Sequence, residues 1–221
     1  MIKQDDFYLK TESNAFFDRW KASRPTSEVE KLRSNKKEIL DLLSEYSDMK
    51  NLNVLEIGCF IGDLLGYLKN EYNCNVTGVE SSSKACDYAK ENFNVDIENA
   101  TIAQSSLFKL TEENFQKFDL IICDDVLSWV SRDLILPTLA VMDWMLKDGG
   151  KIFIRDFSPG FAFAYENHHH PGENIFNFKQ PNGHRGFFLN TGKYFEQATH
   201  LRTDTQYQVI STQRPDLAVW S

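Results

Sequence analysis

Short apolar runs alternate with stretches of helical periodicity through the middle of the chain. Apolar runs bounded by polar residues predict strands at 53–57, 75–80, 118–123 and 151–155, with a weaker one near 95–98. Between them, apolar positions at helical spacing predict helices over 62–71, 82–92 and 132–146. Glycines in Lys147-Asp-Gly-Gly150 predict the end of the last helix, because glycine often follows a helix C-terminus. Strands that alternate with helices predict a parallel sheet covered on both faces.

The two ends of the chain depart from this alternation. Ser27-Glu-Val-Glu30 is a capping box, so a helix is expected over 28–46, with a shorter aromatic helix around 14–21 before it. Near the C-terminus a helix is expected over 191–200. Strands at 205–212 and 217–220 are joined by only four residues, which is too short for a crossover helix and predicts an antiparallel hairpin.

The segment between Asp156 and Thr191 has no clear periodicity. It contains seven of the 17 phenylalanines, Tyr165 and three consecutive histidines. A structureless stretch of this length is unusual in a compact domain and is more often functional. We expect a functional loop or lid here, with a structural plug over the end of the sheet as the alternative.

Composition and charge limit the possible partners. The chain has 221 residues, 42% of them hydrophobic, and its formal charge is 24 − 32 = −8. An acidic chain without a basic run is a poor binder of nucleic acid or anionic membranes. The N-terminus lacks the apolar core of a signal peptide, and four cysteines without C-x-x-C spacing favour reduced thiols. We therefore expect a soluble cytoplasmic protein with no nucleic-acid or membrane partner.

One glycine-containing turn indicates the ligand. The first predicted strand ends in a turn that contains Gly58 and Gly62, and the next strand ends at Glu80, which can accept both hydroxyls of a ribose. The dinucleotide pattern G-x-G-x-x-G would require glycine at 60 and 63, where other residues stand. Glu56, an acid at the strand end, suits a ligand with a nearby positive charge. These features favour S-adenosylmethionine over NAD.

Several motifs in this order resemble class I S-adenosylmethionine-dependent methyltransferases. They are VLEIGCFIGD, TGVE, FDLIICDDVLSWV, LKDGGKIFIRDF and the closing hairpin. The resemblance implies an α/β, three-layer Rossmann-like fold with a seven-stranded, mostly parallel sheet and a terminal antiparallel hairpin. More faintly, residues 156–194 resemble methyltransferases that modify bacterial surface polysaccharides and sugars.

The resemblance also assigns residues and domains. Residues 1–50 would be N-terminal helices that cap the cofactor site, and 51–221 the methyltransferase domain with a substrate segment at 157–190. Many family members have glycine where Phe60 stands, so Phe60 would pack on the cofactor or narrow its site. The residues expected to bind S-adenosylmethionine are Glu56, Gly58, Cys59, Phe60, Gly62, Glu80, Ser81, Ala100, Thr101, Ile102, Cys123 and Asp124.

Histidines are the first candidates for the proton acceptor, since an imidazole titrates near neutral pH. His169 or His170 is our candidate base. A structural cluster or a metal site is the alternative role for the three consecutive histidines, and of these the metal site is not expected. Four cations at 155, 179, 185 and 193 suit a phosphate or carboxylate, or are scattered loop charges. The residues expected to contact the acceptor are Asp125, Asp156, His168, Lys179 and Arg185.

Together these features predict methyl transfer to a small-molecule acceptor, an oxygen of a sugar or phosphorylated metabolite, with surface glycan biosynthesis as a possible setting. The alternatives are a catalytically inactive methyltransferase-like binding module and an NAD-dependent oxidoreductase. The sequence does not identify the acceptor, the methylated atom or the oligomeric state.

Overall fold

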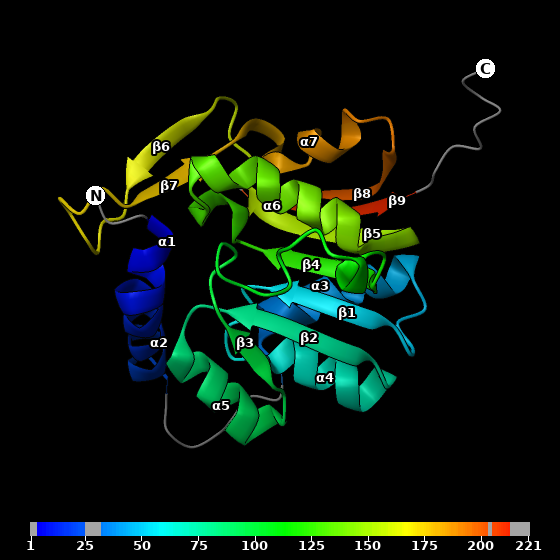
Figure 1. Cartoon of the computed structure of the whole chain (residues 1–221), viewed down its shortest axis with the longest axis horizontal. Coiled ribbons are helices and arrows are strands. Elements are labelled where there is room, and N and C mark those ends of the chain that lie inside the picture. The colour runs from blue at the N-terminus through cyan, green and yellow to red at the C-terminus, as the bar shows by residue number, and fades with distance from the viewer. Residues whose placement is uncertain (1–3, 25–31, 203–204, 213–221) are drawn as a thin grey trace. The chain divides into compact units, whose positions relative to one another are not determined.

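A computed structural model describes residues 4–24, 32–202 and 205–212 (Figure 1). The chain divides into two compact units, Met1–Phe108 and Lys109–Ser221, which are described separately below. The expected division into 1–50 and 51–221 remains a prediction. No helix in the described ranges has the length and apolar character needed to cross a membrane.

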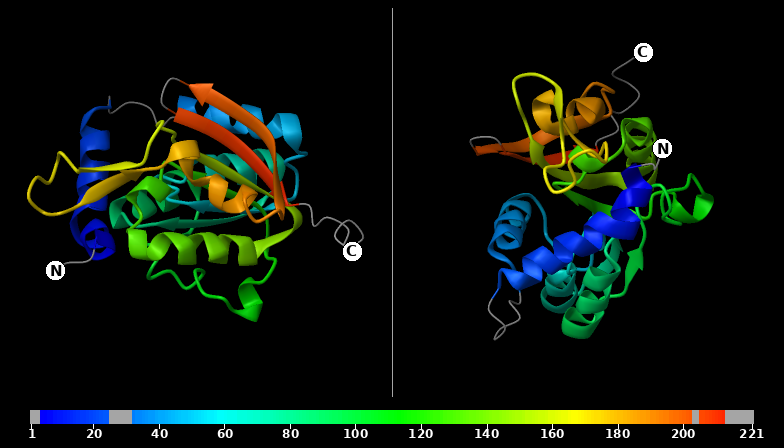
Figure 2. Two further views of the ribbon diagram at one scale, coloured as in Figure 1. Left: turned by 90° about the horizontal axis from the view of Figure 1, so that it is seen from above. Right: turned by 90° about the vertical axis from the view of Figure 1, so that its left-hand side faces the viewer.

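The N-terminal part of the first unit is a single continuous helix (Figure 2). It consists of α1 (Gln4–Phe7), a π-helical turn η1 (Tyr8–Glu12) and α2 (Ser13–Ala22). The predicted aromatic helix at 14–21 is therefore confirmed and extends further toward the N-terminus. The next helix, α3, is described over Ser34–Tyr46, while the expected capping box at 27–30 lies outside the described residues.

Three parallel strands form the sheet of the first unit. They are β1 (Asn53–Ile57), β2 (Asn75–Glu80) and β3 (Ile97–Asn99), connected by α4 (Asp63–Tyr72) and α5 (Ser83–Phe93). β1 pairs with β2, and β2 with β3. Gly78 lets the turn after β1 pack against β2, since a Cβ there would lie 2.7 Å from Cys59 Sγ. The carboxyl ends of β1 and β2 are thereby brought together.

The second unit combines parallel and antiparallel pairing. β4 (Phe118–Asp124) runs parallel to β5 (Leu146–Phe157), and β9 (Thr205–Thr212) pairs antiparallel with both β5 and β8 (Tyr194–Arg202). The helices are α6 (Arg132–Met145) and the short turns η2 (Glu112–Asn114) and η3 (Leu127–Trp129). Counted over both units, the five strands β1–β5 have parallel partners, and β8 and β9 form an antiparallel hairpin. The expected α/β class with a terminal antiparallel hairpin is confirmed.

The hairpin itself is formed by different residues than expected. The predicted helix at 191–200 is wrong, because residues 194–200 lie in the strand β8. β9 is held by its long-range pairing with β5, and β8 forms a hairpin on the other edge of β9, so the conformation of this segment depends on tertiary structure. The predicted strand at 217–220 lies outside the described residues.

The glycine cap predicted at 147–150 is also wrong. α6 ends at Met145, and Leu146 is already extended, with φ −80° and ψ 131°. The pairing of β5 with β4 changes register between Leu146 and Lys151, and Gly149 within this irregular stretch has φ 74°. The two glycines therefore accommodate an irregularity in a strand, instead of ending a helix.

The segment after β5 is structured. β6 (Phe163–Glu166) and β7 (Phe176–Lys179) form a separate antiparallel pair, followed by η4 (Pro181–His184) and α7 (Gly186–Leu189). The absence of a regular pattern in the sequence reflects short elements joined by tight turns. Whether this segment acts as a lid remains a prediction.

Candidate active site

The turn after β1 has an alternating left-handed backbone. Gly58, Phe60 and Gly62 have φ values of 68°, 51° and 68°. The backbone N–H groups of Gly58 and Cys59 donate to the Val79 carbonyl at 2.8 and 3.3 Å, which ties the turn to the end of β2. A Cβ at Gly62 would lie 3.0 Å from Ala89 Cβ, so glycine there permits close packing against α5.

Glu80 is fixed at the end of β2 by donors from this turn and from the start of α5. Its Oε2 accepts from the Phe60 N–H at 3.0 Å, and its Oε1 accepts from the Ser82 N–H at 2.7 Å. Burial raises the pKa of this carboxyl, and the same hydrogen bonds oppose the increase. The Ala100 N–H donates to the Glu80 carbonyl at 3.0 Å. The expected ribose acid and the 100–102 segment therefore lie side by side.

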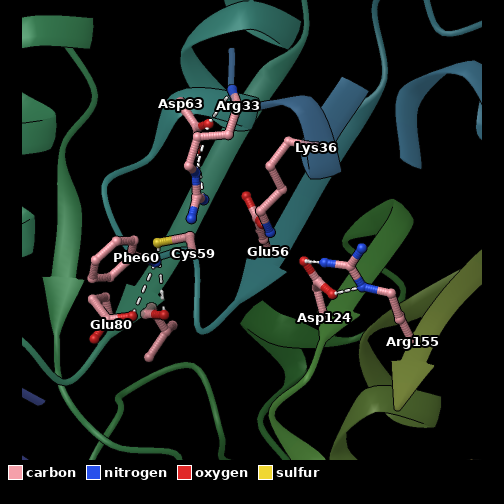
Figure 3. A network of polar contacts seen from close by, with 10 residues as sticks. Arg33, Lys36, Glu56, Cys59, Phe60, Asp63, Glu80, Asp124 and Arg155 are labelled. Atoms are coloured by element: carbon pink, nitrogen blue, oxygen red, sulfur yellow. Dashed lines mark hydrogen bonds and ion pairs between the residues drawn. The ribbon is translucent and has the colours of Figure 1, made fainter. Parts of the chain in front are cut away.

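Two acids of the glycine motif have basic partners at the start of α3 (Figure 3). Lys36 Nζ lies 2.6 Å from Glu56 Oε1, and both side chains are buried. Arg33 donates to Asp63 through Nε at 2.8 Å and Nη2 at 2.7 Å. Burial alone would raise the pKa of Asp63, but the bonds from Arg33 outweigh it and lower the pKa. Sequence reasoning missed both basic residues.

Phe60 contacts the N-terminal helix. Its ring lies 5.2 Å from the rings of both Phe16 and Trp20, and only 8% of the residue is exposed. The Asn14 side chain accepts from the Lys84 N–H at 3.2 Å, which fastens α2 to the first turn of α5. Aromatic packing with α2 thus explains why phenylalanine stands at this position.

In the second unit, the carboxyl ends of β4 and β5 are joined by a buried ion pair (Figure 3). Arg155 donates to Asp124 through Nε and through Nη2, the latter at 2.5 Å from Oδ2. Cys123 is buried within β4. The N–H of Asp125 donates to the Arg155 carbonyl at 2.8 Å, and Asp125 has φ 57°. The pairing of the strands therefore continues one residue beyond β4.

Asp125, Asp156 and Lys179, three of the residues expected to contact the acceptor, lie together, and their contact with an acceptor remains a prediction. Asp125 is an exposed residue, but desolvation of its carboxyl by the surrounding protein raises its pKa to about 7, with Asp156 adding to the increase and Lys179 opposing it. Lys179 Nζ lies 4.0 Å from Asp156 Oδ1 and 3.5 Å from the centroid of the Phe157 ring. Two carboxylates and one ammonium therefore share this site.

His184 is a member of this cluster that sequence reasoning missed. Its Nδ1 lies 3.1 Å from Asp156 Oδ2, and its Nε2 lies 3.3 Å from Arg132 Nη1. The imidazole is buried, and the backbone has φ 66°. The only available signal was a histidine in the same irregular segment as Lys179, without any informative spacing.

The consecutive histidines lie in the turn between β6 and β7. His168 and His169 are exposed with ring centroids 3.9 Å apart, and the His169 N–H donates to Asn167 Oδ1 at 3.0 Å. Within the described ranges, no group of three His, Cys, Asp or Glu side chains is placed to hold a metal ion. The role of His169 or His170 as a base remains a prediction.

Arg185, also expected to contact the acceptor, is engaged elsewhere in the second unit. Its Nη1 lies 3.1 Å from Glu196 Oε2 and donates to Thr199 Oγ1 at 3.3 Å. Both partners belong to β8. These contacts attach the residue before α7 to that strand.

Part of the chain matches a known protein family. Residues 54–150 match the family described as "Methyltransferase domain". Residues 54–150 are therefore a methyltransferase domain. Among curated proteins, it is 30% identical over 108 residues to the uncharacterized protein RP028 of Rickettsia prowazekii, a match that covers 48% of this chain and 43% of that protein. The chain spans less than half the length of the curated relatives it matches.

Solved methyltransferase structures share the fold. The magnesium protoporphyrin IX methyltransferase of Synechocystis PCC 6803, crystallised with S-adenosylhomocysteine, aligns with a TM-score of 0.67 at 16% identity, over 96% of this chain and 100% of that one. The 1,6-didemethyltoxoflavin-N1-methyltransferase of Burkholderia thailandensis aligns with a TM-score of 0.65 at 15% identity, over 96% and 92% of the two chains. At these identities the likeness establishes the fold.

Proposed function

We propose that this methyltransferase domain transfers a methyl group from S-adenosylmethionine to a hydroxyl of a small sugar acceptor. When bound, S-adenosylmethionine supplies a methyl group activated on a sulfonium. Solved structures of the same fold contain S-adenosylmethionine or S-adenosylhomocysteine, which supports this choice of methyl donor. The observation that carries the acceptor assignment is the exposed carboxylate of Asp125, which lies near the buried Asp156.

The residues of the first unit fit the methyl donor. The left-handed turn from Gly58 to Gly62 lets the backbone approach a ligand, and Glu80 is an oriented carboxylate that suits ribose hydroxyls. We place the adenine beside the 100–102 segment, which is hydrogen-bonded to the Glu80 backbone. The sequence suggested that Glu56 faces the positive charge of the ligand, but Lys36 already balances the charge of Glu56. We assign Glu56 to holding the turn in place.

The ion pairs of the second unit favour a neutral acceptor over a phosphorylated one. All four cations considered for phosphate binding face carboxylates: Arg155 faces Asp124, Lys179 faces Asp156, Arg185 faces Glu196 and Lys193 faces Asp143. Asp125, an exposed residue, instead offers carboxylate oxygens that accept hydrogen bonds from hydroxyl groups. With its cations paired to carboxylates, the second unit offers hydrogen-bond acceptors to hydroxyl groups, which suits a polyol.

Exposed aromatic side chains on and before β6 add a surface for stacking. Phe161, Phe163 and Tyr165 are 71%, 41% and 40% exposed, and adjacent rings lie 5.6 and 6.2 Å apart. The Tyr165 ring centroid lies 6.0 Å from Lys179 Nζ, so this row begins beside the polar cluster. An aromatic face next to carboxylates suits the C–H face and the hydroxyls of a sugar ring.

The test is a comparison of acceptors with the purified chain and S-adenosylmethionine. Formation of S-adenosylhomocysteine is measured with free hexoses and deoxyhexoses, with their nucleotide-linked forms and with simple sugar phosphates. We expect turnover of sugars whose reacting hydroxyl is remote from any phosphate, and little effect of Arg185→Gln on their KM. Turnover limited to sugar phosphates, with a KM that rises strongly in Arg185→Gln, would contradict a neutral acceptor.

A further inference from the structure

The β6–β7 pair is held against the rest of the second unit by its side chains. Among the described strands, β6 and β7 pair with each other and with no third strand (Figure 1). An isolated two-stranded sheet is marginally stable in water, so the contacts that it makes with the surrounding protein decide whether it stays in place. The inward face of β7 carries Asn177 and Lys179, which are 0% and 3% exposed. These contacts are therefore largely polar.

The polar groups enclosed here are incompletely hydrogen-bonded. Asn177 Nδ2 and Lys179 Nζ donate to Ser128 Oγ at 3.5 and 3.4 Å, which are long distances for hydrogen bonds. Lys179 Nζ also lies 4.0 Å from Asp156 Oδ1. Asn177 Oδ1, Asp156 Oδ2 and His184 Nδ1 have no hydrogen-bond partner among the described residues. Buried polar atoms in folded proteins nearly always have partners, so enclosing these three atoms costs free energy.

Arg132 determines where the proton of His184 lies. A guanidinium only donates, so His184 Nε2, 3.3 Å from Arg132 Nη1, is the acceptor and the proton of the neutral ring lies on Nδ1. This Nδ1 lies 3.1 Å from Asp156 Oδ2, but the two atoms are not aligned for a hydrogen bond. One donor and one acceptor therefore lie side by side. A hydroxyl group, which donates and accepts at once, is complementary to them.

We propose that the polar groups enclosed by the β6–β7 pair are a subsite for hydroxyl groups of the acceptor, and that the pair opens to admit them. One hydroxyl donates to Asp156 Oδ2 and accepts from His184 Nδ1, while Asn177 Oδ1 accepts from a further hydroxyl of the same ligand. The ligand class, a neutral sugar, rests on the proposed function. The hydroxyls bound here are recognised and are distinct from the one that is methylated. All of these residues belong to the second unit.

The closed arrangement favours opening. An enclosed polar atom without a partner has lost its hydration and gained no hydrogen bond, so contact with a hydroxyl group removes this cost. The aromatic row of β6 is continuous with the subsite, because Tyr165 is paired with Asn177 across the two strands. Residues paired in this way have their side chains on the same face of a sheet. A sugar ring that stacks on the row therefore lies beside the groups that bind its hydroxyls.

Hydrogen–deuterium exchange tests the opening without a ligand. We expect the amides paired between β6 and β7 to exchange faster than those of β4 and β5 in the same unit. Asn177→Leu removes an unpartnered acceptor at similar volume, so exchange across the β6–β7 pair should slow roughly 5-fold or more. Exchange in the native pair as slow as in β4 and β5, or faster exchange in Asn177→Leu, would overturn the opening.

A matched control comes from a second buried asparagine beside β6. Asn167 is 3% exposed, and its Oδ1 accepts from the His169 N–H at 3.0 Å. Asn167→Leu removes a buried acceptor that has a partner, so exchange across the β6–β7 pair should quicken. Slower exchange in both variants would show that leucine alone stabilises the pair, which would overturn the argument from unpartnered atoms.

Kinetics test the ligand, with the sugar of highest turnover in the acceptor comparison. Asn177→Leu and Asp156→Asn should each raise the KM for this sugar roughly 10-fold or more and leave the Kd for S-adenosylmethionine within about twofold. The control is Asp119→Asn, since Asp119 pairs with Lys147 at the other end of β4 and should leave KM unchanged. Unchanged KM in Asn177→Leu and Asp156→Asn overturns the subsite while methyl transfer itself stands. Absence of turnover with every sugar in the native protein would instead overturn the proposed function.

Discussion

Replacing Lys36 with methionine removes the charge that balances the buried Glu56. The two side chains are 3% and 0% exposed, with 2.6 Å between Nζ and Oε1. Removing one partner of such a pair leaves a buried charge uncompensated, which typically costs about 3–5 kcal/mol. Methionine keeps most of the lysine volume, so little of this cost comes from a cavity. We expect Lys36→Met to lose about 3–5 kcal/mol of unfolding free energy.

Urea unfolding followed by circular dichroism measures this loss, and a double-mutant cycle separates its causes. Lys36→Met with Glu56→Leu should recover most of the stability, because an apolar pair of similar volume often matches a buried ion pair. The control is Lys37→Met, since Lys37 is exposed and should change stability by less than about 0.5 kcal/mol. A loss below about 1 kcal/mol in Lys36→Met, or strictly additive effects in the double variant, would refute the reasoning.

Two further predictions concern the first unit. Glu80→Ala should weaken S-adenosylmethionine binding by about 1.5–3 kcal/mol, measured by isothermal titration calorimetry, because hydrogen bonds to a charged group are lost; an unchanged Kd would refute the ribose assignment. Both Phe60→Gly and Phe60→Ala lose the aromatic contacts with α2. Because residue 60 has φ 51°, which glycine adopts more easily than alanine, Phe60→Gly should be more stable than Phe60→Ala by about 1 kcal/mol in urea unfolding. The reverse order would show that the left-handed backbone is unimportant for stability.

Local sequence signals were sufficient for the central elements of the fold. β1 and β2 have the expected bounds. α5 begins at Ser83, one residue after the expected start, because Ser82 caps the helix and its hydroxyl accepts from the Ala85 N–H. Buried parallel strands are short apolar runs, which are visible in any sequence. The segment 191–200 could not be assigned in this way, because β8 forms a hairpin with β9, and β9 is held in place by its pairing with the distant strand β5.

The same distinction applies to the candidate site. Asp125 directly follows the apolar strand β4, and Asp156 is the last residue but one of β5. Both positions lie at the carboxyl ends of parallel strands, which places them at one edge of the second unit's sheet. Lys36 and Lys37 are adjacent lysines in a polar stretch, and nothing in the sequence shows that one is buried and the other exposed. His184 gives no signal either, since its partners come from β5 and α6. Such contacts depend on tertiary packing.

The most direct test of the account is calorimetric titration of the purified native chain with S-adenosylmethionine, with S-adenosylhomocysteine and NAD as comparison ligands. The structure of the turn from Gly58 to Gly62, together with Glu80, predicts saturable 1:1 binding of both sulfur compounds and none of NAD. Binding of NAD alone, or of none of the three, would contradict the assignment of this domain as a methyltransferase that uses S-adenosylmethionine.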